Sequence, residues 1–117
     1  MHYDEDESLT NYVLKHYAHL MTPLESRVMR AIQAEEKARV VQSKEMESSI
    51  RTRWGRTPDE EVAQALEAGA GPFRRGVRER LFRERSADIA INRCPACQRI
   101  VRTPSARQCL WCGYDWH

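Results

Sequence analysis

The stretch that decides the fold is Cys94-Pro95-Ala96-Cys97, then an arginine-containing spacer, then Cys109-Leu110-Trp111-Cys112-Gly113. All four cysteines of the 117-residue chain lie in these two Cys-x-x-Cys pairs, which are eleven residues apart. Two such pairs can present four thiolates tetrahedrally to one metal ion. The spacing therefore predicts one closed metal site with the ligands Cys94, Cys97, Cys109 and Cys112.

Zn²⁺ is the metal that this ligand set favours, and we expect one structural ion. A catalytic zinc keeps a coordination position open for water or substrate, whereas four cysteines close the shell. A redox pair would place one Cys-x-x-Cys at the start of a helix, and a duplicated pair in a small chain is poor evidence for that arrangement. An iron site is the main alternative, since tetrahedral sulfur sites accept either metal.

The cysteine region resembles the short four-cysteine zinc-ribbon family over about residues 92–113, a fifth of the chain. The cysteines take the family's ligand positions, Pro95 matches the Cys-Pro-x-Cys form of the first knuckle, and Gly113 matches the glycine after the second. Gln98 stands where the first knuckle usually has glycine. The resemblance implies a structural zinc ion in a small β fold, and it implies no single function because the family's roles span transcription, translation and scaffolding.

Composition and charge limit the number of domains and the class of partner that we expect. With 41% hydrophobic and 31% charged residues, the chain is typical of one globular domain. Its formal charge of +2 counts the cysteines as neutral. Four thiolates around one Zn²⁺ add about −2, so the zinc-loaded chain is close to neutral and its total charge does not favour nucleic acid.

The sequence contains no membrane or export signal. No apolar run approaches the about twenty residues of a membrane span, and the acidic N-terminus lacks the design of a signal peptide. We therefore expect a cytoplasmic protein without membrane contact. Cysteines in the cytoplasm stay reduced, which favours zinc over disulfides.

The predicted fold is mainly α, with a helical N-terminal body and a small C-terminal β zinc ribbon. We expect an acidic tail at residues 1–8, a helical region of about four helices at residues 9–86, and the four-cysteine ribbon at residues 87–117. Within the last of these, residues 88–92 and 99–102 are β-prone runs that predict two short strands.

Capping residues predict where the helices begin. Ser8 is a candidate N-cap for a first helix that ends near Met21. Thr22-Pro23-Leu24-Glu25 has the residues of a capping box and predicts a second helix. This helix meets no proline or glycine until Gly55, so it is expected to be long. Thr57-Pro58-Asp59-Glu60 repeats the start signal.

Residues 69–72, Gly-Ala-Gly-Pro, end that shorter helix and predict the main joint. The segment after the joint is basic and has a narrow apolar seam of Phe73, Val77 and Leu81. One interpretation is a helix that binds phosphate or acidic groups. The simpler one is a surface helix whose arginines pair with nearby glutamates. The arginines in question are Arg74, Arg75, Arg78, Arg80, Arg83 and Arg85.

Aromatic and arginine side chains of the cysteine region are the other candidates for binding. A zinc module of about thirty residues has almost no interior, so its large rings must pack on the helices, contact a partner or lie partly in water. These residue types dominate protein interfaces and also stack on single-stranded bases. They are Arg99, Arg102, Arg107, Trp111, Tyr114 and Trp116.

Motifs for catalysis are absent from the sequence. It has no nucleophile elbow, phosphate-binding glycine loop or metalloprotease helix, so no small-molecule substrate is indicated. We expect a non-enzymatic protein that binds another protein through its aromatic and arginine surface and its helices. An inhibitor or neutraliser of the immunity or antitoxin type, or an adaptor, would suit this design. The alternative is a nucleic-acid-binding ribbon protein that uses the arginines named above.

Overall fold

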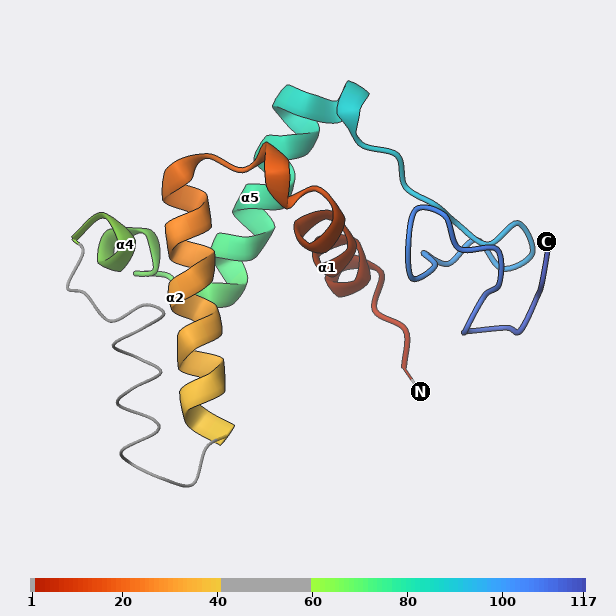
Figure 1. Ribbon diagram of the computed structural model, residues 1–117, viewed down its shortest axis with the longest axis horizontal. Helices are drawn as coiled ribbons and strands as arrows, with labels where there is room; N and C mark the ends of the chain where they lie inside the picture. The colour runs from red at the N-terminus through yellow and green to blue at the C-terminus, as the bar shows by residue number, and fades with distance from the viewer. Residues whose placement is uncertain (1, 41–59) are drawn as a thin grey trace. The chain divides into compact units, whose positions relative to one another are not determined.

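The computed structural model describes residues 2–40 and 60–117 and is mainly helical, which confirms the mainly α prediction (Figure 1). Its contacts divide the chain into two compact units. Unit 1 consists of Met1–Leu20 and Arg74–His117, and unit 2 consists of Met21–Phe73. The predicted metal ligands and both groups of candidate binding residues belong to unit 1.

Unit 1 begins with helix α1, Glu5–His16, which starts four residues before the predicted position. Asp4 is its N-cap, and the Asp4 side chain accepts a hydrogen bond from the Glu7 N–H (3.1 Å). Ser8 lies inside the helix. The acidic residues at the start are therefore part of the helix, where their charges lie at the positive end of its dipole.

α1 ends at His16 rather than near Met21, and a 3₁₀ turn, η1 (Ala18–Leu20), follows it. The Tyr17 N–H still donates to the Val13 carbonyl (2.9 Å), and the Leu20 N–H donates to the Tyr17 carbonyl (3.0 Å). The chain thus tightens into a 3₁₀ turn at the end of the helix, as helix C-termini commonly do.

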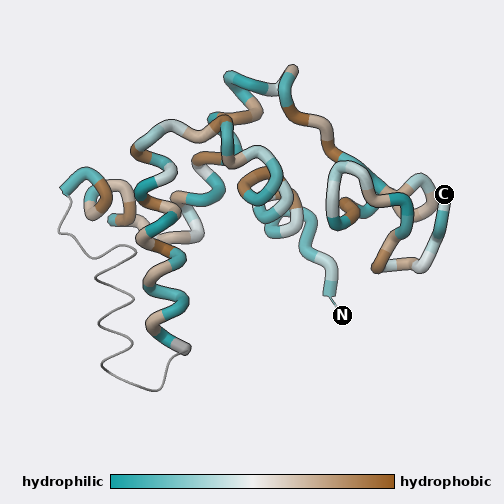
Figure 2. Tube along the Cα trace, viewed as in Figure 1, coloured by the Kyte–Doolittle hydropathy of each residue, from teal (hydrophilic) through white to brown (hydrophobic). Residues whose placement is uncertain are grey.

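Unit 1 continues with helix α5, Ala70–Arg85, of which residues 74–85 belong to the unit. Val77 and Leu81 of the predicted seam are buried, at 3% and 0% exposure. Val13 of α1 is also fully buried. Along both helices, hydrophobic positions recur between hydrophilic ones (Figure 2), which is the pattern of helices that bury one face.

Polar contacts join α5 to α1. Arg78 forms an ion pair with Asp6 and donates to the Thr10 hydroxyl (2.9 Å). Arg74 donates to the Asn11 side chain (2.5 Å). Thr10 is 4% exposed, and its hydroxyl also donates to the Asp6 carbonyl (2.9 Å), so this buried group is satisfied both as donor and as acceptor. Two arginines of the basic segment therefore hold α5 against α1.

Unit 2 contains helix α2, Pro23–Val40, and the short helix α4, Glu60–Ala65. The predicted capping box is confirmed, because the Glu25 N–H donates to Thr22 Oγ1 (3.1 Å) and the Thr22 N–H donates to Glu25 Oε1 (2.9 Å). Arg27 of α2 forms an ion pair with Glu61 of α4 (3.2 Å). The predicted course of α2 to Gly55 and the second start signal at Thr57-Pro58 lie outside the described residues.

α5 begins inside the segment that was predicted to be a joint. Gly69 has a φ of +104° after α4, but Ala70, Gly71 and Pro72 form the first turn of α5. Proline is tolerated there because the first N–H groups of a helix have no partner within it.

The C-terminal part of unit 1 follows η2, Ser86–Asp88, and we call residues 92–116 the four-cysteine module. The two predicted strands are wrong, since residues 89–117 contain only isolated antiparallel bridges, Arg93 with Ile100 and Gln108 with Asp115. Backbone groups that a strand ladder would use bind tyrosine hydroxyls instead, as described below.

Candidate metal centre

The four cysteines lie together, and their sulfur atoms all fall within 4.8 Å of one another. The Sγ atoms of Cys94 and Cys112 are 3.6 Å apart, as are those of Cys97 and Cys109. A tetrahedral ion with metal–sulfur bonds of about 2.3 Å requires sulfur–sulfur separations of about 3.8 Å. The spacing is therefore close to that of a tetrahedral four-thiolate site, and the cluster can hold one metal ion.

Two nearly identical turns form the site. In the first, the Cys94 carbonyl accepts from the Gln98 N–H (2.8 Å), and the Cys94 N–H donates to the Arg99 carbonyl (2.9 Å). The same two bonds recur fifteen residues later, at 2.9 and 2.8 Å, among Cys109, Gly113 and Tyr114. Each turn thus presents its two cysteines to the same point.

Backbone N–H groups point at the first sulfur of each turn. The Ala96 and Cys97 N–H groups donate to Cys94 Sγ (3.3 and 3.4 Å). The Trp111 and Cys112 N–H groups donate to Cys109 Sγ (3.3 and 3.5 Å). Such donors stabilise a thiolate, so the turns are arranged for ionised sulfur.

The pKa values of the thiols reflect this arrangement. Burial raises the pKa of Cys94, but the N–H donors and neighbouring thiols outweigh it and lower the pKa to about 7. For Cys112 the Tyr114 N–H lowers the pKa, yet partial burial and the other three thiols raise it to about 11. The Cys112 thiol therefore does not ionise readily at neutral pH by itself, and a bound cation would remove that obstacle.

Gln98 occupies the position where the second turn has Gly113. Its φ is +66°, and that of Gly113 is +82°. Among the described residues, Gln98 is the one non-glycine with positive φ. The departure from glycine noted in the sequence is therefore accommodated by a left-handed backbone, which is strained for a residue with a Cβ.

The module is attached to α1 through tyrosine hydroxyls. Tyr12 Oη donates to the Ala90 carbonyl (2.9 Å) and accepts from the Asn92 N–H (3.2 Å). Tyr17 Oη accepts from the Ala90 N–H (3.0 Å). The Asn92 side chain in turn donates to two carbonyls of the inter-cysteine spacer, those of Thr103 and Ala106 (both 2.9 Å).

The N-terminal segment makes a second attachment. Tyr3 Oη accepts from the Ile100 N–H (3.0 Å), and the Tyr3 ring meets the Trp111 ring edge-on at 4.9 Å. Glu5 binds the Arg93 guanidinium through both carboxylate oxygens (3.0 and 2.7 Å). Arg93 also lowers the pKa of Glu5, since it stabilises the charged carboxylate.

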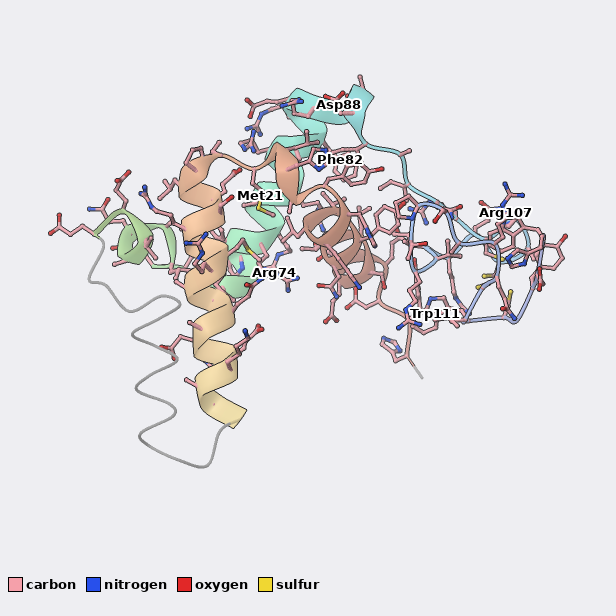
Figure 3. The ribbon with its side chains drawn as sticks, viewed as in Figure 1. Met21, Arg74, Phe82, Asp88, Arg107 and Trp111 are labelled. Atoms are coloured by element: carbon pink, nitrogen blue, oxygen red, sulfur yellow. The ribbon has the colours of Figure 1, made fainter. Side chains whose placement is uncertain are left out.

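The predicted aromatic residues separate into two places. Trp111 lies beside the N-terminal segment and packs on Tyr3, whereas Arg107 projects from another side of the module (Figure 3). Tyr114 is 46% exposed and stacks on Trp116 at 6.0 Å. Trp116 is half-buried against the cluster of Cys94, Val101 and Cys109.

The predicted arginines of the module are all exposed. Arg99 lies over the Tyr3 and Trp111 rings, 5.5 and 6.0 Å from their centroids. The side chains of Arg102 and Arg107 form no ion pair with other described residues. These two positive charges are therefore open to solvent.

Most arginines of α5 have acidic or polar partners. Besides Arg74 and Arg78, Arg80 and Arg83 approach Glu84 (both 3.5 Å), and Arg85 pairs with Asp88 (2.9 Å). Arg75 is exposed and makes no ion pair within the described part of the chain. The structure thus engages five of the six arginines proposed for phosphate binding, and their common field is reduced.

Sequence reasoning missed the residues that attach the module: Tyr3, Glu5, Tyr12, Tyr17, Asn92 and Arg93. Their partners are 73 to 97 residues away in the chain, or belong to the spacer. The available signal was that three of the four tyrosines lie within the first seventeen residues, since a buried tyrosine hydroxyl needs a hydrogen-bond partner.

Comparison with protein-family models, curated proteins and solved structures gave no match to this chain. Among the described residues, every helix is too short or too polar to cross a membrane.

Proposed function

We propose that Cys94, Cys97, Cys109 and Cys112 bind one structural Zn²⁺ and that residues 92–116 form an abbreviated zinc ribbon. The observation that carries this proposal is the set of four sulfur atoms within 4.8 Å, each pair supplied by a turn of the same hydrogen-bonding pattern. Four thiolates leave no open coordination position, so the ion supports the fold rather than catalysis.

Metal analysis of the purified full chain tests this part. We expect one zinc atom per chain, and visible d–d bands of tetrahedral geometry after exchange with Co²⁺. Cys94→Ser should lose the metal, whereas Ser105→Ala, a change in the spacer outside the ligand set, should keep it. A purified chain that contains iron, or folds fully without metal, would contradict the zinc assignment.

The zinc-loaded protein is, in this proposal, a non-enzymatic cytoplasmic binder of another protein. Its contact surface consists of the exposed Tyr114 ring, the half-buried Trp116 ring on which it stacks, and Arg107. Support comes from the exposure of Tyr114 and from the unpaired charge of Arg107, because aromatic residues and arginine dominate interface energetics. Trp111 belongs to the internal attachment, so it is left out of this surface. An enzyme or toxin inhibitor and an adaptor subunit both fit this class.

Capture from cell lysate by the tagged full chain, with and without nuclease, tests the partner class. We expect Tyr114→Ala and Arg107→Ala to reduce capture at least about fivefold, the loss that truncating a contact worth about 1 kcal/mol produces. Arg75→Ala is the matched control, since it removes the same charge from an exposed position on α5. Capture that disappears with nuclease, or falls equally in Arg75→Ala, would favour nucleic acid instead.

A further inference from the structure

Unit 1 contains a pocket of about 240 Å³ between α1 and the four-cysteine module. Its walls come from both elements: Asn11 and Lys15 of α1, and Ile100, Arg102, Leu110 and Trp111 of the module. The pocket is therefore formed only when the module is attached to α1, and it is distinct from the metal site.

One wall of the pocket is apolar and largely held in place. Ile100 is buried, and its N–H is fixed by the Tyr3 hydroxyl. The Trp111 ring is held by the Tyr3 ring. Leu110, in contrast, is 59% exposed and is the most exposed large hydrophobic residue that the structure describes. The exposed Leu110 side chain offers apolar area that a ligand can cover.

The rim of the pocket is positively charged and uncompensated. Lys15 lies on the α1 side and Arg102 on the module side, and the described residues that line the pocket include no aspartate or glutamate. In the described chain neither of these side chains forms an ion pair. His16 donates its Nε2–H to the Arg102 carbonyl (3.1 Å), which fixes the backbone that carries Arg102. The rim is thus complementary to a carboxylate.

The size of the pocket restricts the ligand further. Pockets for cofactors and other large organic ligands have volumes of about 300–1,000 Å³. About 240 Å³ instead suits a single residue with a large apolar side chain. The C-terminal residue of a polypeptide fits this space and carries an apolar side chain and a carboxylate together.

We propose that this pocket binds the apolar C-terminal residue of a partner protein, with the side chain against Leu110 and Trp111 and the carboxylate between Lys15 and Arg102. This inference rests on the proposed role in protein binding and names the part of the partner that is recognised. Side-chain burial supplies affinity, and the two cations select a free carboxylate over an internal peptide bond.

Titration of the zinc-loaded full chain with acetylated tetrapeptides, followed by amide NMR shifts, tests the pocket. The probes are acetyl-Gly-Ser-Gly-Leu with a free carboxylate, the same peptide as its carboxamide, and acetyl-Gly-Ser-Gly-Gly. We expect saturable shifts at Lys15, Ile100 and the Trp111 indole, with a Kd of about 1 mM or tighter. The carboxamide and the glycine-ended peptide should each bind about tenfold more weakly.

Charge variants provide the matched control. Arg102→Gln and Lys15→Gln should each weaken binding of the free-carboxylate peptide about tenfold. Neither change should alter the affinity for the carboxamide peptide. Arg75→Gln removes the same charge from an exposed position of α5 that lies outside the pocket and should have no effect. Equal binding of acid and carboxamide, equal loss in all three variants, or no saturable shift up to about ten times the expected Kd would overturn the proposal.

The two proposals fail separately. If the leucine peptide binds as expected but lysate capture does not depend on Tyr114 or Arg107, the pocket stands and the proposed ring surface is wrong. If capture depends on Tyr114 and Arg107 while the free-carboxylate peptide does not bind, the pocket proposal is wrong and the protein-binding proposal stands.

Discussion

At Gln98 the backbone is left-handed, with a φ of +66°. The equivalent position of the second turn is Gly113, whose added Cβ would meet no atom within 4 Å. Any difference between glycine and other residues at these positions is therefore conformational rather than steric. A left-handed conformation costs a residue with a Cβ about 1–2 kcal/mol, partly offset by the greater unfolded-state freedom of glycine.

Gln98→Gly should therefore stabilise the module by about 0.5–1 kcal/mol. Because folding and metal binding share one free energy in such modules, zinc should bind about two- to fivefold more tightly. Competition with a calibrated chelator measures the change. The reciprocal variant Gly113→Gln should weaken zinc binding, and identical affinities for all three proteins would contradict the strain at Gln98.

Tyr12 illustrates how one side chain attaches the module. It is 4% exposed, and its hydroxyl satisfies both the Ala90 carbonyl and the Asn92 N–H. Removal of the hydroxyl leaves the Asn92 N–H without this acceptor, whereas the Ala90 carbonyl still accepts from the Tyr17 hydroxyl (3.1 Å). A backbone N–H that loses its partner in a part-buried position is more costly than the loss of an exposed hydrogen bond.

Tyr12→Phe should lower the free energy of unfolding by about 1–3 kcal/mol, while zinc content stays at one per chain. Urea unfolding followed by circular dichroism gives the first quantity, and metal analysis gives the second. Tyr114→Phe is the control, since the Tyr114 hydroxyl makes no hydrogen bond within the described residues. The free energy of unfolding of this variant should stay within about 0.5 kcal/mol of the parent's. A Tyr12→Phe protein as stable as the parent would show that the attachment contributes little.

At the scale of elements, the four-cysteine module is stabilised by few apolar residues. Its buried cluster consists of Cys94, Val101 and Cys109, with Trp111 and Trp116 packed against it. So small a core does not stabilise about 25 residues alone, and the module has no strand ladder. Metal coordination is therefore expected to supply most of the folding free energy of the module.

Removal of the metal should unfold the module and leave the α2 and α4 helices of unit 2 intact. Hydrogen exchange after chelation should show loss of protection at the Cys94, Val101 and Cys109 amides, while amides within α2 keep theirs. The Val28 amide is a suitable reference within α2, since its side chain is fully buried. Cys109→Ser should reproduce the chelated state, and protection that survives in it would contradict a metal-dependent fold.

Across the whole of unit 1, α1 is the element to which both α5 and the module are attached. Arg78 of α5 pairs with Asp6, and Arg93 of the module pairs with Glu5. Neighbouring acidic residues of one helix turn thus hold two segments from the C-terminal half. The acidic head that looked like a tail in the sequence is a structural junction.

The Glu5–Arg93 pair gives this junction a pH dependence. Arg93 holds the pKa of Glu5 below its ordinary value of 4.5, so the pair's contribution is present above about pH 4.5 and is lost as pH falls through the lowered pKa. Glu5→Gln should cost about 0.5–1 kcal/mol at pH 7, as expected for an exposed bidentate pair. Urea unfolding should be measured for the parent and for Glu5→Gln from pH 7 to pH 3.5. The difference between their free energies of unfolding should become smaller towards pH 3.5. A difference that stays constant with pH would exclude the ion pair as its cause.

The sequence by itself determined features that depend on neighbouring residues. Cysteine spacing predicted the four-cysteine cluster, the Thr22 to Glu25 pattern predicted the start of α2, and the seam of Val77 and Leu81 identified the buried face of α5. Each Cys-x-x-Cys pair, the capping box and the apolar seam lies within one short turn or one turn of helix, where geometry follows from residue spacing.

The tertiary structure alone decided the role of the tyrosines, the course of residues 88–102 and the pocket at Leu110. The alternating apolar residues predicted strands, but Ala90, Asn92 and Ile100 bind hydroxyls from Tyr17, Tyr12 and Tyr3. These partners are separated by more than seventy residues, and a hydroxyl can satisfy a backbone group as well as a strand can. Which of the two partners a backbone group takes depends on which one the fold brings near, and spacing along the chain does not contain that information.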